Sequence, residues 1–466
     1  MADTDLDFLS WLDTARLIRE RAISPVTVVN HQLERITSLD GGLNSFIHVC
    51  ADSALECARR AERDLTQRRS IGPLHGVPFS LKDIVDAVGL PTTAHSRILM
   101  DNTARADAFV TAQLKQAGGI LLGKLATHEF ALGGPAFDLP WPPARNPWDR
   151  RRHPGGSSSG AGAAVAAGMV SLAIGTDTAG SVRNPASACG IVGMKPTYGL
   201  ISRRGVFPLS FSLDTVGLLT RTVSENAAAL NLVAGFDAAD PTSANRPTPD
   251  FTTALGRDIT GLRVGVIKHF HLRDKVADQQ VSHTLDSVCD TLADLGADLV
   301  EVETRPLDEF IGCNRVIMLS EAYSIHERWL KMCPGDYSAL TRRRLLEGAF
   351  LSASDYLRAN RARRHLTFAM GQLLNHADVL VCASSLDPPC LIDDANDVAR
   401  TYPRHARAPF NVSGHPAIAL PGGFTDTGLP VGFQIIGKHF DEKTVYRVAH
   451  AFEAVTPWSR RHPPSS

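Results

Sequence analysis

The sequence has no excess of charge of either sign and no long apolar run. Its 466 residues carry a formal net charge of −1, and the lysines and arginines are scattered along the chain. This balance gives no reason to expect a nucleic-acid partner, and nothing resembles a membrane-spanning segment. The first twenty residues carry acids where a signal peptide needs a basic region. We therefore expect a cytoplasmic protein that binds neither nucleic acid nor a membrane.

The eight cysteines lack the spacing of a metal or redox site. None forms a C-x-x-C pair, and the spacing fits neither a zinc site nor a dense disulfide framework. We expect buried free thiols in a reducing compartment. Hydrophobic residues make up 44% of the chain, which is enough for a large core.

Short apolar runs alternate with helix-length segments from Leu74 onwards. The runs that predict strands are Val77–Val85, Ile120–Leu122, Leu172–Ile174, Leu262–Ile267, Leu299–Val302, Val379–Val381, Ala417–Leu420 and Gly432–Ile436. The clearest predicted helices are Ala51–Leu65, Leu285–Leu295, Arg342–Thr367 and Thr444–Ala454, and the first seventy or so residues look helical. This alternation predicts an α/β fold with a mixed β-sheet between helical layers.

Two long loops interrupt this pattern. Residues 237–258 are interpreted as a plain surface connection, whereas residues 135–159 lead into an unusual Gly/Ser segment, His153–Gly168. A flexible linker is disfavoured there because the helix and strand that follow are core-like. A phosphate cradle is disfavoured because neither G-x-x-x-x-G-K-[ST] nor G-x-G-x-x-G is present. A tight turn that presents hydroxyls beside a site is the third interpretation.

A second polar turn, Gly175–Ala186, follows a predicted strand directly. Ser181 could expose its hydroxyl there, and successive backbone N–H groups could stabilise an oxyanion. A nucleophilic serine needs a base, and no histidine lies nearby in a hydrolase-like context. Lys82 lies between apolar neighbours, where desolvation would lower its pKa and allow it to accept a proton. Taken singly, a turn serine and a strand lysine are more often structural.

Together these segments resemble the amidase signature family over essentially the whole chain. The matching stretches are LHGVPFSLKDIVD (74–86), LGKLATHEFA (122–131), NPWD (146–149), PGGSSSG (154–160), GTDTAGSVRNPA (175–186), GIVGMKPTYG (190–199), SLDTVGLLTRTV (212–223) and GLPVGFQIIGK (428–438). The resemblance implies the amidase signature fold, a mixed twisted sheet between helical layers. It makes residues 71–466 the catalytic domain, which would form one compact unit with the N-terminal segment 1–70.

The resemblance also implies a Ser–cis-Ser–Lys triad. By position in the motifs, Ser181 is the nucleophile, Ser157 is the relay and Lys82 is the base, with a cis peptide bond between Gly156 and Ser157. The oxyanion donors would be the backbone N–H groups of Thr178, Ala179, Gly180 and Ser181. Supporting positions would be Ser158, Asp177 and Arg183. An acyl-enzyme would form and be hydrolysed without a metal or organic cofactor.

Two positions depart from the family pattern. The usual D-T-G-G-S is D-T-A-G-S here, so Ala179 adds a methyl group beside the oxyanion turn. The usual G-G-S-S-G-G-S is G-G-S-S-S-G-A here, so Ser159 replaces a glycine. Both changes leave the three triad positions intact, so we expect an active enzyme.

The resemblance leaves two functions open. One is a stand-alone hydrolase of a small amide, anilide or carbamate, which the ending TPWSRRHPP (456–464) favours. The other is the amidase subunit of a tRNA-dependent glutamyl/aspartyl amidotransferase. A silent binding protein is disfavoured by the intact triad. A homodimer is possible because dimerisation is common in the family.

The substrate pocket is the least readable part of the sequence. We expect its walls to come from Cys313–Tyr337, Cys382–Asp393 and the loop 135–148. Phe137, Trp141 and Phe207 could add an apolar wall, although each could equally be a packing residue.

Overall fold

The computed structural model describes residues 6–67 and 71–464. Its centre is an 11-stranded sheet in the order β1-β3-β2-β4-β6-β5-β10-β11-β9-β7-β8. The strands are β1 (Phe46–Val49), β2 (Pro78–Lys82), β3 (Ile120–Leu125), β4 (Leu172–Asp177), β5 (Val192–Lys195), β6 (Thr215–Thr220), β7 (Arg263–Val266), β8 (Asp298–Glu301), β9 (Val379–Ala383), β10 (Ala417–Phe424) and β11 (Pro430–Gly437). Strands β3, β2 and β4 are parallel neighbours, as are β9, β7 and β8, and antiparallel pairs join the two groups. The sheet is therefore mixed, as predicted.

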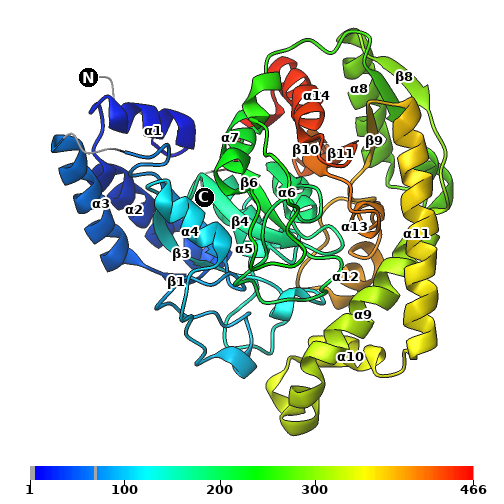
Figure 1. Cartoon of the computed structure of the whole chain (residues 1–466), viewed down its shortest axis with the longest axis horizontal. Helices are drawn as coiled ribbons and strands as arrows, with labels where there is room; N and C mark the ends of the chain where they lie inside the picture. The colour runs from blue at the N-terminus through cyan, green and yellow to red at the C-terminus, as the bar shows by residue number, and fades with distance from the viewer. Residues whose placement is uncertain (1–5, 68–70, 465–466) are drawn as a thin grey trace.

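Helices cover both faces of this sheet (Figure 1). They are α1 (Trp11–Arg19), α2 (Pro25–Leu43), α3 (Ala51–Thr66), α4 (Phe109–Gln116), α5 (Ser159–Ala166), α6 (Arg183–Cys189), α7 (Val223–Val233), α8 (Gln279–Asp294), α9 (Leu307–Met332), α10 (Ala339–Gly348), α11 (Ala353–His376), α12 (Ala395–Thr401), α13 (Pro409–Val412) and α14 (Glu442–Val455). Adjacent residues of β11 show the two layers. Gly432 lies against Ser187 of α6, whereas Phe433 packs edge-on against Phe452 of α14. Successive strand residues point to opposite faces, so α6 and α14 lie on opposite sides of the sheet.

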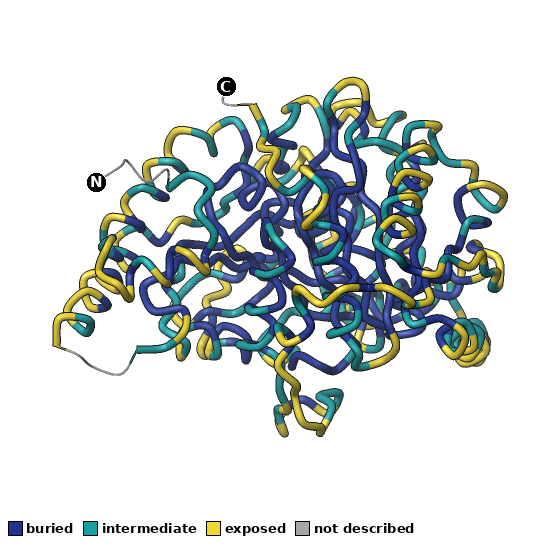
Figure 2. Tube along the Cα trace, turned by 90° about the horizontal axis from the view of Figure 1, so that it is seen from above, coloured by how far each residue is buried: buried dark blue, intermediate teal, exposed yellow. Residues whose placement is uncertain are grey.

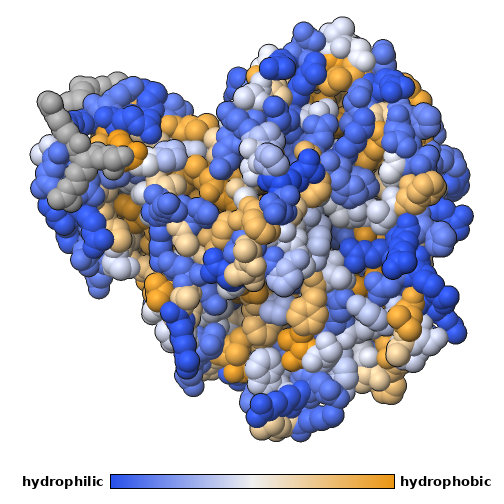
Figure 3. All heavy atoms as spheres, in the orientation of Figure 1, coloured by the Kyte–Doolittle hydropathy of each residue, from blue (hydrophilic) through white to orange (hydrophobic). Residues whose placement is uncertain are grey.

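The middle of the sheet is buried on both sides. Every residue of β2, β4, β5, β6, β9 and β11 is buried, and Figure 2 shows this buried chain surrounded by exposed turns and outer helix faces. Hydrophilic residues dominate the margins of the face seen in Figure 3. Strands covered on both faces consist of nearly continuous apolar runs, which is why most of them could be predicted from the sequence.

The structure corrects several local expectations. Residues 342–367 do not form one helix, because the chain breaks between α10 and α11, where Ser352 and Asp355 form a capping box that starts α11. Strands β5 and β6 and the long helix α9 were not predicted. The eight cysteines are unpaired, but Cys57 is exposed and only five of the eight are buried.

The N-terminal segment is not purely helical. Strand β1 lies within it and pairs antiparallel with β3 at the edge of the sheet. Side chains of α2, among them Val29 and Ile36, share an apolar cluster with Ala161 and Val165 of α5. The segment and the sheet thus pack together, while the boundary predicted at residue 70 lies outside the described residues.

Candidate active site

Lys82 lies at the carboxyl end of a central parallel strand. It is the last residue of β2, and the parallel neighbour β4 ends at Asp177. Parallel neighbours end at the same edge of a sheet, where α/β proteins place their ligands. The polar end of β4 and the turn after it therefore lie beside Lys82.

The Lys82 side chain is enclosed by the protein and has no carboxylate neighbour among the described residues. The side chain is fully buried, its Nζ lies 2.7 Å from Ser157 Oγ, and it donates to Thr176 Oγ1 at 2.9 Å. Among the described residues no Asp or Glu oxygen lies within 4 Å of it, whereas the buried Lys124 has Asp83 at 3.0 Å. Burial lowers the pKa of Lys82 to about 7, against a smaller opposing effect of Asp214 and Asp177. A large part of Lys82 is therefore a neutral amine near neutral pH.

Ser157 lies in the Gly/Ser turn that enters α5. The peptide bond between Gly156 and Ser157 is cis, as the family resemblance implied. The His128 ring covers Gly156 so closely that a methyl group there would overlap Cε1 of the ring, and the backbone N–H of His128 donates to the Ser157 carbonyl at 3.1 Å. Glycine at 156 is thus required by close approach, and the turn aims the Ser157 hydroxyl at Lys82.

Ser181 lies in the turn between β4 and α6. Its side chain is half-buried and lines, together with Ser157, a cavity of about 360 Å³. The turn depends on Gly180, whose φ of +117° disfavours other residues. Within the described part of the chain no hydrogen bond joins Ser181 Oγ to Ser157 Oγ. The structure places both hydroxyls at one cavity, and proton transfer between them stays a prediction.

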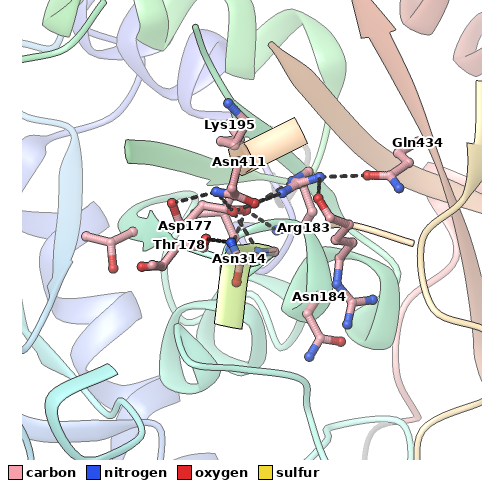
Figure 4. A network of polar contacts seen from close by, with 12 residues as sticks. Asp177, Thr178, Arg183, Asn184, Lys195, Asn314, Asn411 and Gln434 are labelled. Atoms are coloured by element: carbon pink, nitrogen blue, oxygen red, sulfur yellow. Dashed lines mark hydrogen bonds and ion pairs between the residues drawn. The ribbon is translucent and has the colours of Figure 1, made fainter. Parts of the chain in front are cut away.

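A buried ion pair braces the Ser181 turn. Asp177 and Arg183 are both fully buried and 2.9 Å apart, and Asp177 also accepts from the Gly180 N–H at 2.8 Å. Arg183 reaches across to Asn411 and Gln434, and Asn411 donates back to Asp177 (Figure 4). This network holds the pKa of the Asp177 carboxyl well below its usual range against the cost of burial. Arg183 therefore supports the turn from behind and does not line the cavity.

The expected oxyanion donors are not equivalent. Thr178, Ala179, Gly180 and Ser181 all line the cavity. The Gly180 N–H already donates to the Asp177 carboxylate, so in this structure it is not free to bind an oxyanion. Asn314 of α9 holds the turn from the other side by donating to the Thr178 carbonyl at 3.0 Å. The N–H groups of Thr178, Ala179 and Ser181 stay the predicted donors to a developing oxyanion.

Ser158, a predicted supporting position, and Ser159, which departs from the family pattern, both have structural contacts. Ser158 links the turns, because its Oγ donates to the Thr176 carbonyl and accepts from the Thr176 N–H, both at 3.3 Å, and its N–H donates to the Ser181 carbonyl. Ser159 is buried as the first residue of α5, with Oγ 3.4 Å from the Ala126 carbonyl. Ser159 thus fits inside the fold, outside the cavity lining.

The expected cavity walls are largely wrong. Only the start of the segment 313–337 contributes, through Asn314, Arg315, Met318 and Leu319, and the described residues of 382–393 and 135–148 do not line this cavity. Phe137 is 55% exposed, and Phe207 packs against Phe130 and Trp329. The actual walls come from α9, α10, the chain from Tyr402 to Ala408 and the stretch from Ala131 to Gly133, so they combine apolar side chains with several arginines.

Sequence reasoning also missed several groups at the site. Thr176, Asn314, Asn411, Gln434 and Arg407 lie outside the residues to which the motifs gave a role. Thr176 directly follows Gly175 in a quoted motif and could have been considered. Gln434 also lies in a quoted motif (428–438), and Asn314 lies in the segment 313–337 that was expected to line the pocket. Asn411 and Arg407 meet the site only through long-range folding, and no local signal marks them.

With this geometry established, comparison with known proteins identifies the family. The amidase family model matches residues 27–446. An amidase of Pseudomonas putida is 39% identical over 472 residues, covering 99% of this chain and 98% of the relative. The A subunit of the glutamyl-tRNA(Gln) amidotransferase of Chloroflexus aurantiacus is 36% identical over 485 residues, covering 99% of both. A bacterial aryl acylamidase described as belonging to the amidase signature enzymes is 25% identical, with a TM-score of 0.91 and coverage of 98% of both chains. The chain belongs to the amidase signature family, whose members hydrolyse C–N bonds.

Membrane spans and metal clusters do not occur in the described part of the chain. Within residues 6–67 and 71–464, no helix is both long and apolar enough to cross a membrane. In the same two ranges, no group of three or more histidine, cysteine or carboxylate side chains is placed to hold a metal ion.

Proposed function

We propose that this protein is a stand-alone amidohydrolase that cleaves an amide-type C–N bond of a small molecule through Ser181, Ser157 and Lys82. The observation that carries the proposal is the 2.7 Å contact between the buried Lys82 Nζ and Ser157 Oγ at the cavity that also exposes Ser181. A buried lysine without a carboxylate partner is uncommon, and the contact with the Ser157 hydroxyl at the cavity is what distinguishes Lys82 from Lys195, the other buried lysine of the described chain without such a partner.

The proposed reaction begins with neutral Lys82. Its amine takes the proton of Ser157, Ser157 takes the proton of Ser181, and Ser181 Oγ attacks the carbonyl carbon. The N–H groups of Thr178, Ala179 and Ser181 stabilise the oxyanion. The proton then returns through Ser157 to the leaving nitrogen, the C–N bond breaks, and water repeats the sequence to release the acid.

The amidase subunit of an amidotransferase is the second candidate, because relatives of that description reach 36% identity over almost the whole chain. Three observations support the stand-alone enzyme over it. The P. putida amidase has the higher identity, 39%, the structure of an aryl acylamidase superimposes closely, and the ending TPWSRRHPP (456–464) resembles stand-alone amidases. We further propose a small-molecule partner only, with neither nucleic acid nor membrane, and residues 71–466 as the catalytic domain.

Hydrolysis of a substrate panel by the purified protein tests the proposal. The panel contains aliphatic amides, anilides, carbamates, a urea derivative and glutamine, with Ser181→Ala run in parallel. Turnover that disappears in the variant supports a stand-alone serine amidase. Silence on the panel, with glutamine cleaved only after partner subunits of an amidotransferase are added, would instead support the second candidate.

A further inference from the structure

A second cavity is formed by residues that the proposed reaction does not use. This cavity, the rear pocket, has a volume of about 260 Å³, and its apolar walls come from Val206, Pro208, Phe211, Val216 and Pro241. It shares no lining residue with the cavity that holds Ser157 and Ser181. The Phe211 side chain is 52% exposed, so an aromatic ring borders the open side of the rear pocket.

The rear pocket adjoins the proposed base through a single side chain. Lys82 Nζ contacts Ser157, a residue of the substrate cavity, at 2.7 Å, and Thr176, a residue of the rear pocket, at 2.9 Å. Asp214, also in the rear pocket, accepts from Thr178 Oγ1 at 2.6 Å. A molecule in the rear pocket would therefore touch a hydrogen-bond partner of the base and a partner of the oxyanion turn.

The charged groups around the rear pocket are already balanced within the protein. The lining contains Arg203, Arg204, Asp214 and Asp240, so their formal charges cancel. Arg204 pairs with Asp237 at 2.8 Å. The carboxylates of Asp214 and Asp240 each accept from two backbone N–H groups and one hydroxyl. An ion would find no free counter-charge in this lining, so a neutral ligand fits it better.

Two hydrogen-bond donors of the lining are unused. Thr176 Oγ1 accepts from Lys82, and no hydrogen bond in the described ranges uses the hydrogen of the Thr176 hydroxyl. Arg203 Nε has no partner among the same residues. A buried donor without an acceptor costs free energy. A ligand with an acceptor oxygen would remove this cost.

We propose that the rear pocket binds a neutral monocyclic aromatic molecule carrying a hydrogen-bond acceptor, and that this molecule inhibits the enzyme without entering the substrate cavity. A cavity of about 150 Å³ holds benzene, so the rear pocket accommodates one ring with a short substituent. The ring packs against Phe211, and the acceptor binds the Thr176 hydroxyl.

The inhibition follows from the hydroxyl that the ligand and Lys82 share. An acceptor on the Thr176 hydroxyl makes its oxygen a stronger acceptor for the Lys82 N–H groups. This favours the ammonium form of Lys82, which cannot take the Ser157 proton. The binding site is independent of the proposed function, whereas the inhibition rests on it.

Binding of benzyl alcohol tests the site without requiring turnover. This probe has one ring, one acceptor oxygen and no charge, and saturation-transfer NMR should show saturable binding with a Kd on the order of 1 mM. Ala239→Trp should abolish binding because Ala239 is an exposed residue of the lining and the indole fills the pocket. The matched control is Ala238→Trp, at the neighbouring exposed residue outside the lining, and it should bind like the wild type. Thr176→Val should weaken binding about two- to tenfold, the range of one neutral hydrogen bond. Benzylamine, which is cationic at pH 7, should bind at least about tenfold more weakly.

Steady-state kinetics test the inhibition. At pH 7, saturating benzyl alcohol should lower kcat on the best substrate of the panel about two- to tenfold, the range of a neutral hydrogen bond, and leave KM unchanged. Ala239→Trp should be insensitive to benzyl alcohol, and Ala238→Trp should be inhibited like the wild type.

Several results would overturn the proposal. Absence of saturable binding, or undiminished binding in a folded Ala239→Trp, overturns the rear pocket as a site. Competitive inhibition would place benzyl alcohol in the substrate cavity instead. Equal binding of benzylamine would refute the neutral class of ligand, and binding with no effect on kcat would refute the inhibition. If the wild type cleaves nothing on the panel, the NMR comparison of Ala239→Trp with Ala238→Trp still decides the site, so failure of the hydrolase is distinguishable from failure of the pocket.

Discussion

The pH dependence of turnover follows from the burial of Lys82. Its amine must be neutral to accept the Ser157 proton, and burial lowers its pKa to about 7. Below pH 7 the neutral fraction falls tenfold per pH unit, so kcat/KM at pH 5 should be about 100-fold below its alkaline plateau. The rate should thus rise with pH through about 7. Initial rates from pH 5 to 9 on the best substrate of the panel measure this directly.

A second buried lysine provides the matched control. Lys195 is also fully buried, and burial lowers its pKa to about 7 as well, but its Nζ donates to the Pro196 carbonyl, whereas the Nζ of Lys82 contacts the hydroxyl of the cavity residue Ser157. Lys82→Met should lower kcat/KM by about 10²- to 10⁴-fold, the contribution of a general base, and abolish the pH dependence near 7. Lys195→Met should retain the pH dependence near 7. A flat or falling profile in the wild type, or a transition near pH 7 that survives in Lys82→Met, would refute the assignment of Lys82 as the base.

Three further predictions concern the turns around the site. Ser157→Ala should reduce kcat by about 10²-fold or more because it breaks the relay. Ser158→Ala loses only long hydrogen bonds and should reduce kcat by less than about tenfold. Steady-state rates compare the two variants, and equal losses of kcat would contradict the relay. Asp177→Asn leaves the buried Arg183 guanidinium without its charge partner and should destabilise the protein by about 3–5 kcal/mol. Urea unfolding should show this as a lower midpoint, and an unchanged midpoint would contradict the bracing role of Asp177. Gly156→Ala should abolish activity because its methyl group meets the His128 ring. The double variant Gly156→Ala/His128→Ala should regain part of the activity. No recovery in the double variant would show that the clash is not the cause.

Local sequence patterns predicted those parts of the fold in which the apolar residues of the pattern are the buried ones. Strands β2, β4 and β11 are apolar runs bounded by Gly or Pro, and α3 buries one small-residue face formed by Ala54 and Ala58. These elements could be predicted because the burial follows from the local residues, which are mostly apolar along the whole of each strand and small and apolar on one face of α3.

Helix α9 could not be predicted in this way because polar groups are buried along it. Asn314, Glu321 and His326 are buried beside its apolar residues. Glu321 accepts from Ser210 and Tyr356, which satisfies its charge through partners distant in the sequence. These residues interrupt the apolar period, so the helix has no clear amphipathic pattern.

The same distinction applies to the site. Lys82, Ser157 and Ser181 lie in motifs that resemble those of a family, so their positions could be predicted, and their catalytic roles stay predictions. Arg407 lies in no motif that was singled out, and it reaches Gly180 only because the chain between α12 and α13 folds back over the Ser181 turn. Such contacts depend on the complete fold, and spacing in the sequence does not encode them.

Covalent labelling with a fluorophosphonate tests the central claim most directly, because this reagent captures a nucleophilic serine without requiring the natural substrate. Peptide mass spectrometry should place one adduct on Ser181 in the wild type, and Ser181→Ala should gain no adduct. Labelling in Lys82→Met should be much slower, because the serine then has no base. An adduct on another residue, or full turnover by Ser181→Ala, would contradict the account.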